Sequence, residues 1–199
     1  MDNRLMAIDN IATELFINHG YSRTKVSYIA KKTGISVGAI YNLFENKQAI
    51  LKFIIKNSID PNHINSISRL PIKESDFNNL ETDVKLFFEK NKSNFESNIH
   101  NDTYSFEEML SDIFDFVNRY GRIFLIYENN RDICNNLFLI YINGRNSFFN
   151  SIFSYIQLLE KNKKIRTLKY PEYDTRLIIE TVAWWLTYGH IYGYNKLIF

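Results

Sequence analysis

The sequence predicts an all-α fold. Glycine and proline are scarce, with 7 and 3 among 199 residues, whereas a sheet-rich fold would need frequent turns. Apolar residues recur at helical spacing along most of the chain. The hydrophobic share of 45%, with 16 Phe and 13 Tyr, is ample for a packed core. Long helices joined by few breaks account for all three observations.

The first two helices are predicted from apolar periodicity and from residues typical of helix ends. Apolar side chains at helical spacing extend from Leu5 to His19, and Gly20 ends this helix. Thr24 is expected to cap a short second helix. That helix ends at Thr33-Gly34. The sequence therefore predicts a long helix followed by a short one.

Two further helices complete the predicted N-terminal part. Ser36 is expected to cap a third helix, from Val37 to Leu43. Glu45-Asn46-Lys47 begins a fourth. Since Gly34 can adopt the positive φ of a tight corner, the second and third helices are typical of a helix-turn-helix. Such a pair binds DNA by placing its second helix in the major groove.

The remainder of the chain is predicted to form a helical bundle. Residues 60–76 contain Pro61 and Pro71 and little periodicity, so we expect a linker there. This placement gives a DNA-binding domain of residues 1–58 and a ligand-binding and dimerisation domain of residues 59–199. The expected helices of the second domain cover residues 77–95, 106–127, 130–161 and 173–196.

Charge divides the chain in the same way. Residues 1–58 carry eight basic and four acidic side chains, a net charge of +4, and the remainder has a net charge of −2. A basic head on a slightly acidic body fits a polyanionic partner for the head. An ordinary solvated basic face would give the same count.

Composition favours a soluble cytoplasmic protein. The single cysteine, Cys134, cannot form an intramolecular disulfide, which favours a reducing compartment. No signal-peptide pattern is present at the N-terminus, and no apolar run approaches the ~20 residues that span a bilayer.

The sequence also argues against an enzyme, a bound metal and a cofactor. The four histidines are scattered, without metal-ligand spacing, and no glycine-rich phosphate loop is present. Cys134 lies on an apolar stretch, as a buried inert thiol would. Two alternatives stay open: an enzyme, and a helical interaction protein that has kept the fold but lost DNA binding.

The first 55 residues or so resemble the tetracycline-repressor (TetR) family of bacterial regulators. The matching positions are Ala12 to Phe16, His19 to Tyr21, Thr24, Val26, Ile29, Ala30, Thr33 to Phe44, Asn46 and Lys47. The resemblance implies a homodimer, a recognition helix in the major groove and release from DNA by a small-molecule effector. Two positions depart from it, because family members often carry a basic residue at Val37 and a histidine at Leu43.

The expected DNA contacts divide into two kinds. Phosphate contacts are expected from Thr24, Lys25, Ser36, Gly38, Tyr41 and Lys47. Asn42 can pair with adenine, while Val37 or Ala39 can touch a thymine methyl group. Since no arginine lies between Ser36 and Phe44 to read guanine, we expect an A·T-biased palindrome. Alternatively, Tyr41 packs against the first helix, Asn42 is merely solvated, and the two lysines are ordinary surface residues.

Aromatic residues in the body admit a ligand pocket or a plain core. The candidate lining residues are Tyr104, Phe106, Tyr120, Tyr141 and Trp185. Nearby carboxylates, Asp112 and Asp115 among them, would suit a cationic flat ligand, or they form a wet acidic face. The helices of residues 130–161 and 173–196 are the expected dimer surface, with Gly144, Ser147 and Ser151 permitting close approach. The predicted function is a transcriptional repressor released from operator DNA by a small, largely apolar or aromatic effector.

Overall fold

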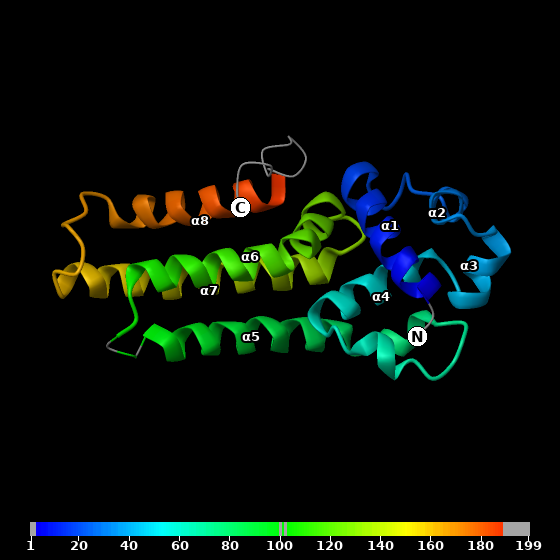
Figure 1. Cartoon of the computed structure of the whole chain (residues 1–199), viewed down its shortest axis with the longest axis horizontal. Coiled ribbons are helices and arrows are strands. Elements are labelled where there is room, and N and C mark those ends of the chain that lie inside the picture. The colour runs from blue at the N-terminus through cyan, green and yellow to red at the C-terminus, as the bar shows by residue number, and fades with distance from the viewer. Residues whose placement is uncertain (1–2, 100, 102, 189–199) are drawn as a thin grey trace. The chain divides into compact units, whose positions relative to one another are not determined.

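The computed structural model describes residues 3–99, 101 and 103–188, with side chains as far as residue 185. These residues form α-helices joined by turns and two short 3₁₀ helices (Figure 1), which confirms the predicted all-α fold. The helices are α1 (Asn3–His19), α2 (Val26–Thr33), α3 (Val37–Leu43), α4 (Lys47–Ile59), η1 (His63–Ser66), η2 (Glu74–Phe77), α5 (Leu80–Ile99), α6 (Phe106–Asn129), α7 (Asn135–Lys161) and α8 (Pro171–Tyr188). The last part of the helix predicted for residues 173–196 lies outside the described residues. In the part of the chain described, no helix is long and apolar enough to cross a membrane.

The chain folds into two compact units. The first consists of Met1–Lys85 and Arg122–Ile140, and the second of Leu86–Gly121 and the chain from Tyr141 onward. α5, α6 and α7 therefore each contribute residues to both units. These units do not divide at residue 58, so the functional division into residues 1–58 and 59–199 remains a prediction.

The first unit is built around α1. This helix packs against α2 and α4, and α2 packs against α3. Ile8 and Phe16 from α1, Ile29 from α2, Ile40 from α3 and Phe53 from α4 are completely buried. Burying each such side chain contributes roughly 1.5–3 kcal/mol, and this packing fixes the angle between α2 and α3.

The expected linker at residues 60–76 is instead a packed part of the first unit. It contains η1 and most of η2, and it returns to the turn between α3 and α4. There Ile72 forms a parallel bridge with Phe44, and its side chain is only 3% exposed. This segment is attached to the first unit partly by backbone hydrogen bonds, which leave no hydrophobic periodicity in the sequence.

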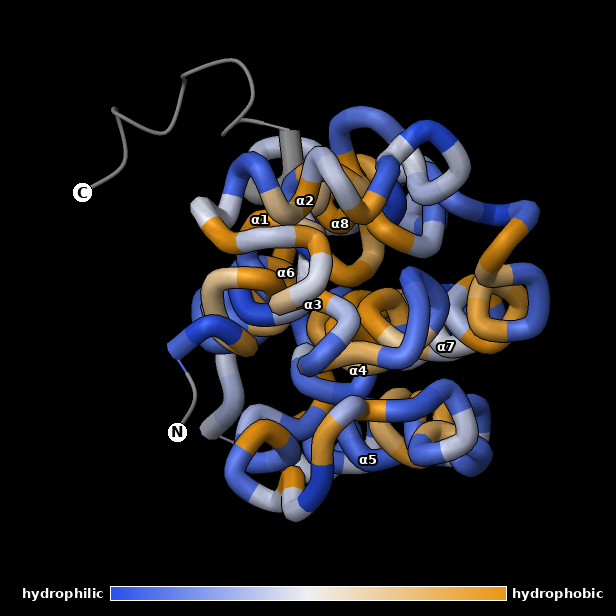
Figure 2. Tube along the Cα trace, turned by 90° about the vertical axis from the view of Figure 1, so that its right-hand side faces the viewer, coloured by the Kyte–Doolittle hydropathy of each residue, from blue (hydrophilic) through white to orange (hydrophobic). Residues whose placement is uncertain are grey.

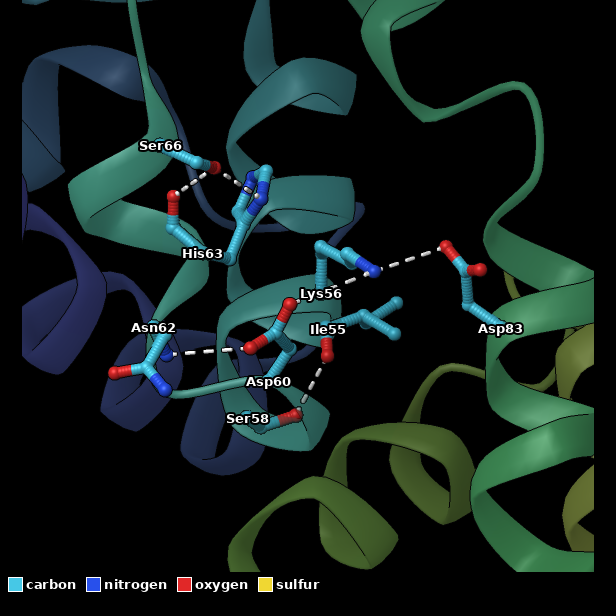
Figure 3. A network of polar contacts seen from close by, with 8 residues as sticks. All are labelled: Ile55, Lys56, Ser58, Asp60, Asn62, His63, Ser66 and Asp83. Carbon is cyan, nitrogen blue, oxygen red and sulfur yellow. Dashed lines mark hydrogen bonds and ion pairs between the residues drawn. The ribbon is translucent and has the colours of Figure 1, made fainter.

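Polar contacts also hold the end of α4 (Figure 3). The Lys56 ammonium lies 3.1 Å from Asp83 Oδ2 on α5 and 3.8 Å from Asp60 Oδ2. His63 packs against Phe53 and Phe77, with ring centroids 6.2 Å and 5.8 Å away. Burial, followed by the positive charge of Lys56, lowers the pKa of His63 below its ordinary value. The neutral imidazole is therefore the form that this packing favours.

The second unit has an aromatic and aliphatic core made by α5, α6, α7 and α8. Figure 2 shows hydrophobic and hydrophilic residues interspersed along each helix, as amphipathic helices require. Its buried core residues are Phe95, Tyr104, Met109, Ile113, Val117, Ile152, Tyr155, Ile156, Leu159 and Val182. Arg145 pairs with Glu180, and the Arg176 guanidinium lies 4.6 Å from the Phe149 ring centroid. These two contacts join α7 to α8.

The small residues of α7 face α5 within the same chain. A Cβ atom on Gly144 would lie 2.5 Å from the Phe88 ring, so the ring rests directly on the helix backbone. The Ser151 hydroxyl donates to Glu96 Oε1 at 2.8 Å. The expectation that Gly144 and Ser151 permit close approach of a second subunit was wrong, because α5 already occupies this face.

Candidate functional site

The corner between α2 and α3 has the geometry of a helix-turn-helix. Gly34 adopts φ 73° and ψ 19°, and its N–H donates to the Ala30 carbonyl. Ser36 then caps α3, since its hydroxyl accepts from the Ala39 N–H at 3.0 Å. The left-handed conformation at Gly34 would strain a side chain carrying Cβ. Both residues therefore set the direction in which α3 leaves the corner.

α3 presents one face to the solvent and one to the core. Ile40 and Leu43 are buried. On the other face, Val37 and Tyr41 are 39% and 48% exposed, and the exposed Asn42 lies beside Tyr41. Because Tyr41 is exposed, the alternative that it packs against α1 is wrong. The outer face thus offers a methyl group, a phenol hydroxyl and an amide.

α2 and the residue before it form a basic surface, of which the sequence-based prediction included Lys25 but not Lys31 and Lys32. Lys25, Lys31 and Lys32 are all exposed, and Lys32 Nζ lies 5.8 Å from the ring centroid of the exposed Tyr28. Residues 21–44 contain four basic side chains and no acidic one. Sequence reasoning missed Lys31 and Lys32, because a count of charges does not show which lysines are exposed on the helix.

Thr24 does not have the role expected from the sequence. Its side chain is completely buried, and its hydroxyl donates to the carbonyls of Gly20 at 2.8 Å and Leu15 at 3.3 Å. Its N–H is also bonded, to the Tyr21 carbonyl. Thr24 therefore neither caps α2 nor has a polar side-chain group facing a phosphate. The residue before α2 is Lys25, which makes no side-chain cap.

Lys47 points into the head. Its ammonium donates to the carbonyls of Tyr21 at 2.7 Å and Thr24 at 2.9 Å, and it lies 4.0 Å from the Tyr21 ring centroid. Burial lowers the pKa of Lys47 below its ordinary value. The side chain therefore fastens the α1–α2 loop to the start of α4, in place of the phosphate contact expected for it.

The end of α6 is fastened to the same loop. Asn130 Nδ2 donates to the carbonyls of Phe16 at 3.2 Å and Ile126 at 2.8 Å. Its Oδ1 accepts from the Tyr21 N–H, and Asn129 Nδ2 donates to the Ile17 carbonyl at 3.1 Å. These two amides satisfy carbonyls at the end of α1 that have no partner within the helix. Sequence patterns give no sign of a contact across more than a hundred residues.

In the second unit, α5, α6 and α7 line an open hollow of about 220 Å³. Its lining residues are Asn91, Asn94, Phe95, Asn98, Asp112, Asp115, Phe116, Arg119, Tyr120 and Phe148. The wall therefore combines aromatic rings with amides, carboxylates and the Arg119 guanidinium. The Tyr120 ring contacts Phe87 at 4.7 Å and Phe116 at 5.2 Å between centroids.

Only one of the five predicted ligand residues, Tyr120, lines this hollow. Tyr104 is buried behind it, and its hydroxyl donates to Asp112 Oδ2 at 2.6 Å. Desolvation, followed by this hydrogen bond to Asp112, raises the Tyr104 pKa, so the phenol stays protonated. Phe106 packs against the core, Tyr141 lies buried with its ring 6.3 Å from Phe88, and Trp185 lies beside Trp184 on α8. The last three belong to packing contacts away from the hollow.

A second hollow, of about 310 Å³, lies in the first unit between α4, the first turn of α5 and the start of α7. Its wall includes Leu51 and Ile55 of α4 and the buried Cys134. Burial raises the pKa of the Cys134 thiol to about 12, so the thiolate nucleophile is scarce at neutral pH. No group of three His, Cys, Asp or Glu side chains that could hold a metal occurs among the described residues.

The α2–α3 corner, its exposed recognition face and the basic surface beside it define a helix-turn-helix domain. Residues 10–54 match the family model described as "Bacterial regulatory proteins, tetR family". This match, confined to the N-terminal domain, supports a TetR-type transcriptional regulator.

Two relatives are similar to the chain over a short stretch. The fatty acid metabolism regulator protein of Bacillus subtilis (strain 168) is 38% identical over 56 residues, which is 28% of this chain and 29% of the relative. The HTH-type transcriptional regulator HbdR of Aromatoleum sp. (strain CIB) is 37% identical over 60 residues, or 30% and 26% of the two chains. The match thus spans less than a third of either relative. Among solved structures, Salmonella enterica GusR aligns over 93% of this chain and 82% of its own, with 14% identity and a TM-score of 0.38.

Proposed function

We propose that this protein is a transcriptional repressor that binds operator DNA through α2 and α3. The observation that carries the proposal is the exposed face of α3 beside a basic surface without acidic residues. Phosphate contacts dominate the affinity of such domains, and the helix in the major groove supplies sequence preference. Binding to chromosomal DNA would place the protein in the cytoplasm.

The exposed residues suggest which contacts are made. Lys25 and the exposed side chains of α2 are suited to contact DNA phosphates. The Tyr41 hydroxyl can also form a hydrogen bond with a DNA phosphate. Gly38 and Ser36 lie at the exposed start of α3. Asn42 can donate to and accept from adenine, and the Val37 methyl groups fit thymine. We therefore infer an A·T-biased operator.

A homodimer is supported by an apolar stripe on α8. Tyr173, Leu177 and Trp184 are 75%, 66% and 45% exposed, and their spacing of four and seven residues places them on one helix face. Leu158 on α7 is a further exposed apolar residue, at 41%. Exposed apolar surface of this kind marks an interaction site. Two copies would carry two recognition helices to the two halves of a palindrome.

An effector is supported by the hollow in the second unit. Aromatic rings on its wall suit a planar apolar group, whereas Asp112, Asp115 and the neighbouring amides suit polar or cationic substituents. We propose an aromatic effector that also carries hydrogen-bonding groups. α6 lines the hollow and, as one continuous helix, ends beside the amides that hold the α1–α2 loop. Ligand binding can therefore change the DNA-binding conformation only if the ligand binds one position of α6 more tightly than another.

The proposal is tested by selecting duplexes from a randomised library with the full-length protein. We expect an A·T-biased palindrome and an affinity that falls steeply with salt. Asn42→Ala should reduce discrimination at one base pair per half-site by ~1–3 kcal/mol. Asn10→Ala, at an exposed position of α1, is the control. A protein that enriches no sequence at low salt would contradict the proposed function, and an unchanged preference in Asn42→Ala would remove this residue from the base readers.

A further inference from the structure

The segment of residues 69–77, here named the strap, returns to the C-terminal end of α3. The Ile72 N–H donates to the Leu43 carbonyl at 2.8 Å, and the Ile72 carbonyl accepts from the Glu45 N–H at 2.9 Å. Leu43 is the last residue of α3, and the last carbonyls of a helix have no partner within it. The strap is thus hydrogen-bonded to the C-terminal end of α3, the proposed recognition helix.

Two further contacts fasten the strap next to this bridge. The Glu74 N–H donates to Glu45 Oε2 at 3.1 Å, and the Lys52 ammonium lies 2.9 Å from Glu74 Oε1. Ile72 is 3% exposed, so its side chain fills the core while its backbone makes the bridge. The strap is therefore attached to the α3–α4 turn by its backbone, by a side chain of the turn and by a side chain of α4.

The other end of the strap leads directly into α5. Phe77 is 5% exposed and packs against His63, which in turn packs against Phe53 of α4. α5 begins three residues later, at Leu80. The strap is consequently a short connection between the start of α5 and the end of α3, separate from the path through α4.

We propose that the strap is a positioning element for the recognition helix, a role that rests on the proposed DNA-binding function. α3 has only seven residues, so its orientation depends on how its two ends are held. Gly34 and Ser36 hold the first end, and the strap holds the second. Tyr41 and Asn42 lie within the last three residues of α3, next to the bridge. Groups that read bases require rigid support from their neighbours, and the strap supplies it.

The same geometry gives α5 a means of acting on α3. α5 contributes Asn91 and Phe95 to the wall of the effector hollow, and the same helix begins at the end of the strap. A shift of α5 along its axis would pull on Phe77 and hence on Ile72.

The test uses the full-length protein with Glu45→Ala and Lys52→Met combined. This pair removes both side-chain fastenings, and it leaves the net charge and the buried Ile72 unchanged. The control combines Lys56→Met with Asp83→Asn, which removes the two ion pairs of Lys56 at constant charge but leaves the strap attached to α3. Each protein is measured on a duplex selected from a randomised library by the wild type, and on a scrambled duplex. Hydrogen exchange of the Ile72 amide and the thermal midpoint are also recorded.

We expect faster exchange at Ile72, and a loss of about 5-fold or more in affinity for the selected duplex, as removal of two polar contacts implies. Affinity for the scrambled duplex and the thermal midpoint should stay close to wild type, as should all values of the control. A parallel loss on both duplexes with a lowered midpoint would mean that the strap only stabilises the fold, and would overturn the proposal. Faster exchange with unchanged affinity for the selected duplex would overturn it too. If the wild type selects no duplex, the DNA-binding function itself fails, and the exchange data still show whether the fastenings hold the strap.

Discussion

The Lys47 ammonium shows how far one side chain can depart from its apparent role. At the start of a helix in a basic head, a lysine suggests a phosphate contact. Its hydrogen bonds to the Tyr21 and Thr24 carbonyls instead make it part of the fold of the α1–α2 loop. Hydrogen bonds to charged groups contribute about 1.5–3 kcal/mol each when both partners are held, so this residue stabilises the platform on which α2 is built.

Replacing Lys47 should therefore affect stability before it affects DNA contacts. We expect Lys47→Met to lower the free energy of unfolding by about 1–3 kcal/mol in urea denaturation. Lys85→Met, at an exposed position of α5, serves as the control. In contrast, Lys25→Met should leave stability unchanged. It should reduce the slope of log affinity against log salt concentration by about the contribution of one phosphate contact. If Lys47→Met changed the salt slope alone, the phosphate role expected from the sequence would be restored.

Single residues were predictable where local chemistry decides their role. Ser36 caps α3 and Gly34 adopts the positive φ, both as the sequence indicates. Thr24 and Lys47 were not predictable, because their partners are backbone carbonyls brought close only by the fold. The same holds for Asn130, whose amide contacts residues 109 and 114 positions away.

Between α1 and α4, a half-buried carboxyl group makes the stability of the head sensitive to pH. Asp9 Oδ2 accepts from Asn57 Nδ2 at 2.8 Å. Burial raises the pKa of Asp9 from 3.8 to about 6, although the Asn57 hydrogen bond and the charge of Arg122 on α6 act in the opposite direction. Because the folded state holds this proton more tightly than the unfolded state, its contribution to stability is complete below pH 3.8 and is lost as the pH rises through 6.

We expect wild type to lose about 1 kcal/mol of stability between pH 5 and 7.5 relative to Asp9→Asn, which cannot titrate. His63 acts in the opposite sense, because its lowered pKa makes the folded state less stable as the pH falls. The comparison with Asp9→Asn at each pH cancels this contribution, since His63 is present in both proteins. Urea unfolding at the two pH values measures the difference. Parallel pH profiles for the two proteins would show that Asp9 is ionised throughout this range.

The helices themselves followed from hydrophobic periodicity, whereas the partners of their faces did not. α7 carries small residues at a spacing that suggests a subunit interface, yet Gly144 lies under Phe88 of its own chain. Periodicity shows which residues share a face of a helix, but it does not say which element covers that face. The strap was missed for a related reason: a backbone bridge requires no particular side chains.

On α8, the exposed stripe allows the dimer prediction to be placed on named residues. Leu177→Glu should convert the dimer to a monomer by light scattering at micromolar concentration, because an interface cannot bury this charge without a partner. Operator affinity should fall with it, since one head neutralises too few phosphates. Leu86→Glu, which replaces a similarly exposed leucine of α5, should change neither. A Leu177→Glu protein that remains dimeric would move the interface to another surface.

At the scale of the whole molecule, effector and operator must influence each other equally. A panel of aromatic amines screened by thermal shift should yield a stabilising compound that weakens operator binding by about 5–150-fold. The operator should weaken binding of the same compound by the same factor. Tyr120→Ala, which removes a ring from the wall of the hollow, should abolish both effects. Phe114→Ala alters a 39% exposed ring on the same helix and should retain them. Stabilisation that persists in Tyr120→Ala would place the ligand elsewhere.

The bridge at Ile72 has a consequence for building chimeric regulators. In such work a DNA-binding head is exchanged between relatives by cutting the chain after the fourth helix. A cut at residue 58 here would leave the Leu43 carbonyl and the Glu45 N–H without their partners, and would uncover Phe53 where His63 packs against it. A transplantable head must therefore run through Phe77, and its recipient must supply an amide where Asn130 stands. The DNA-binding module is discontinuous in sequence, so new operator specificity is better introduced by substitution on α3 than by exchange of the N-terminal quarter.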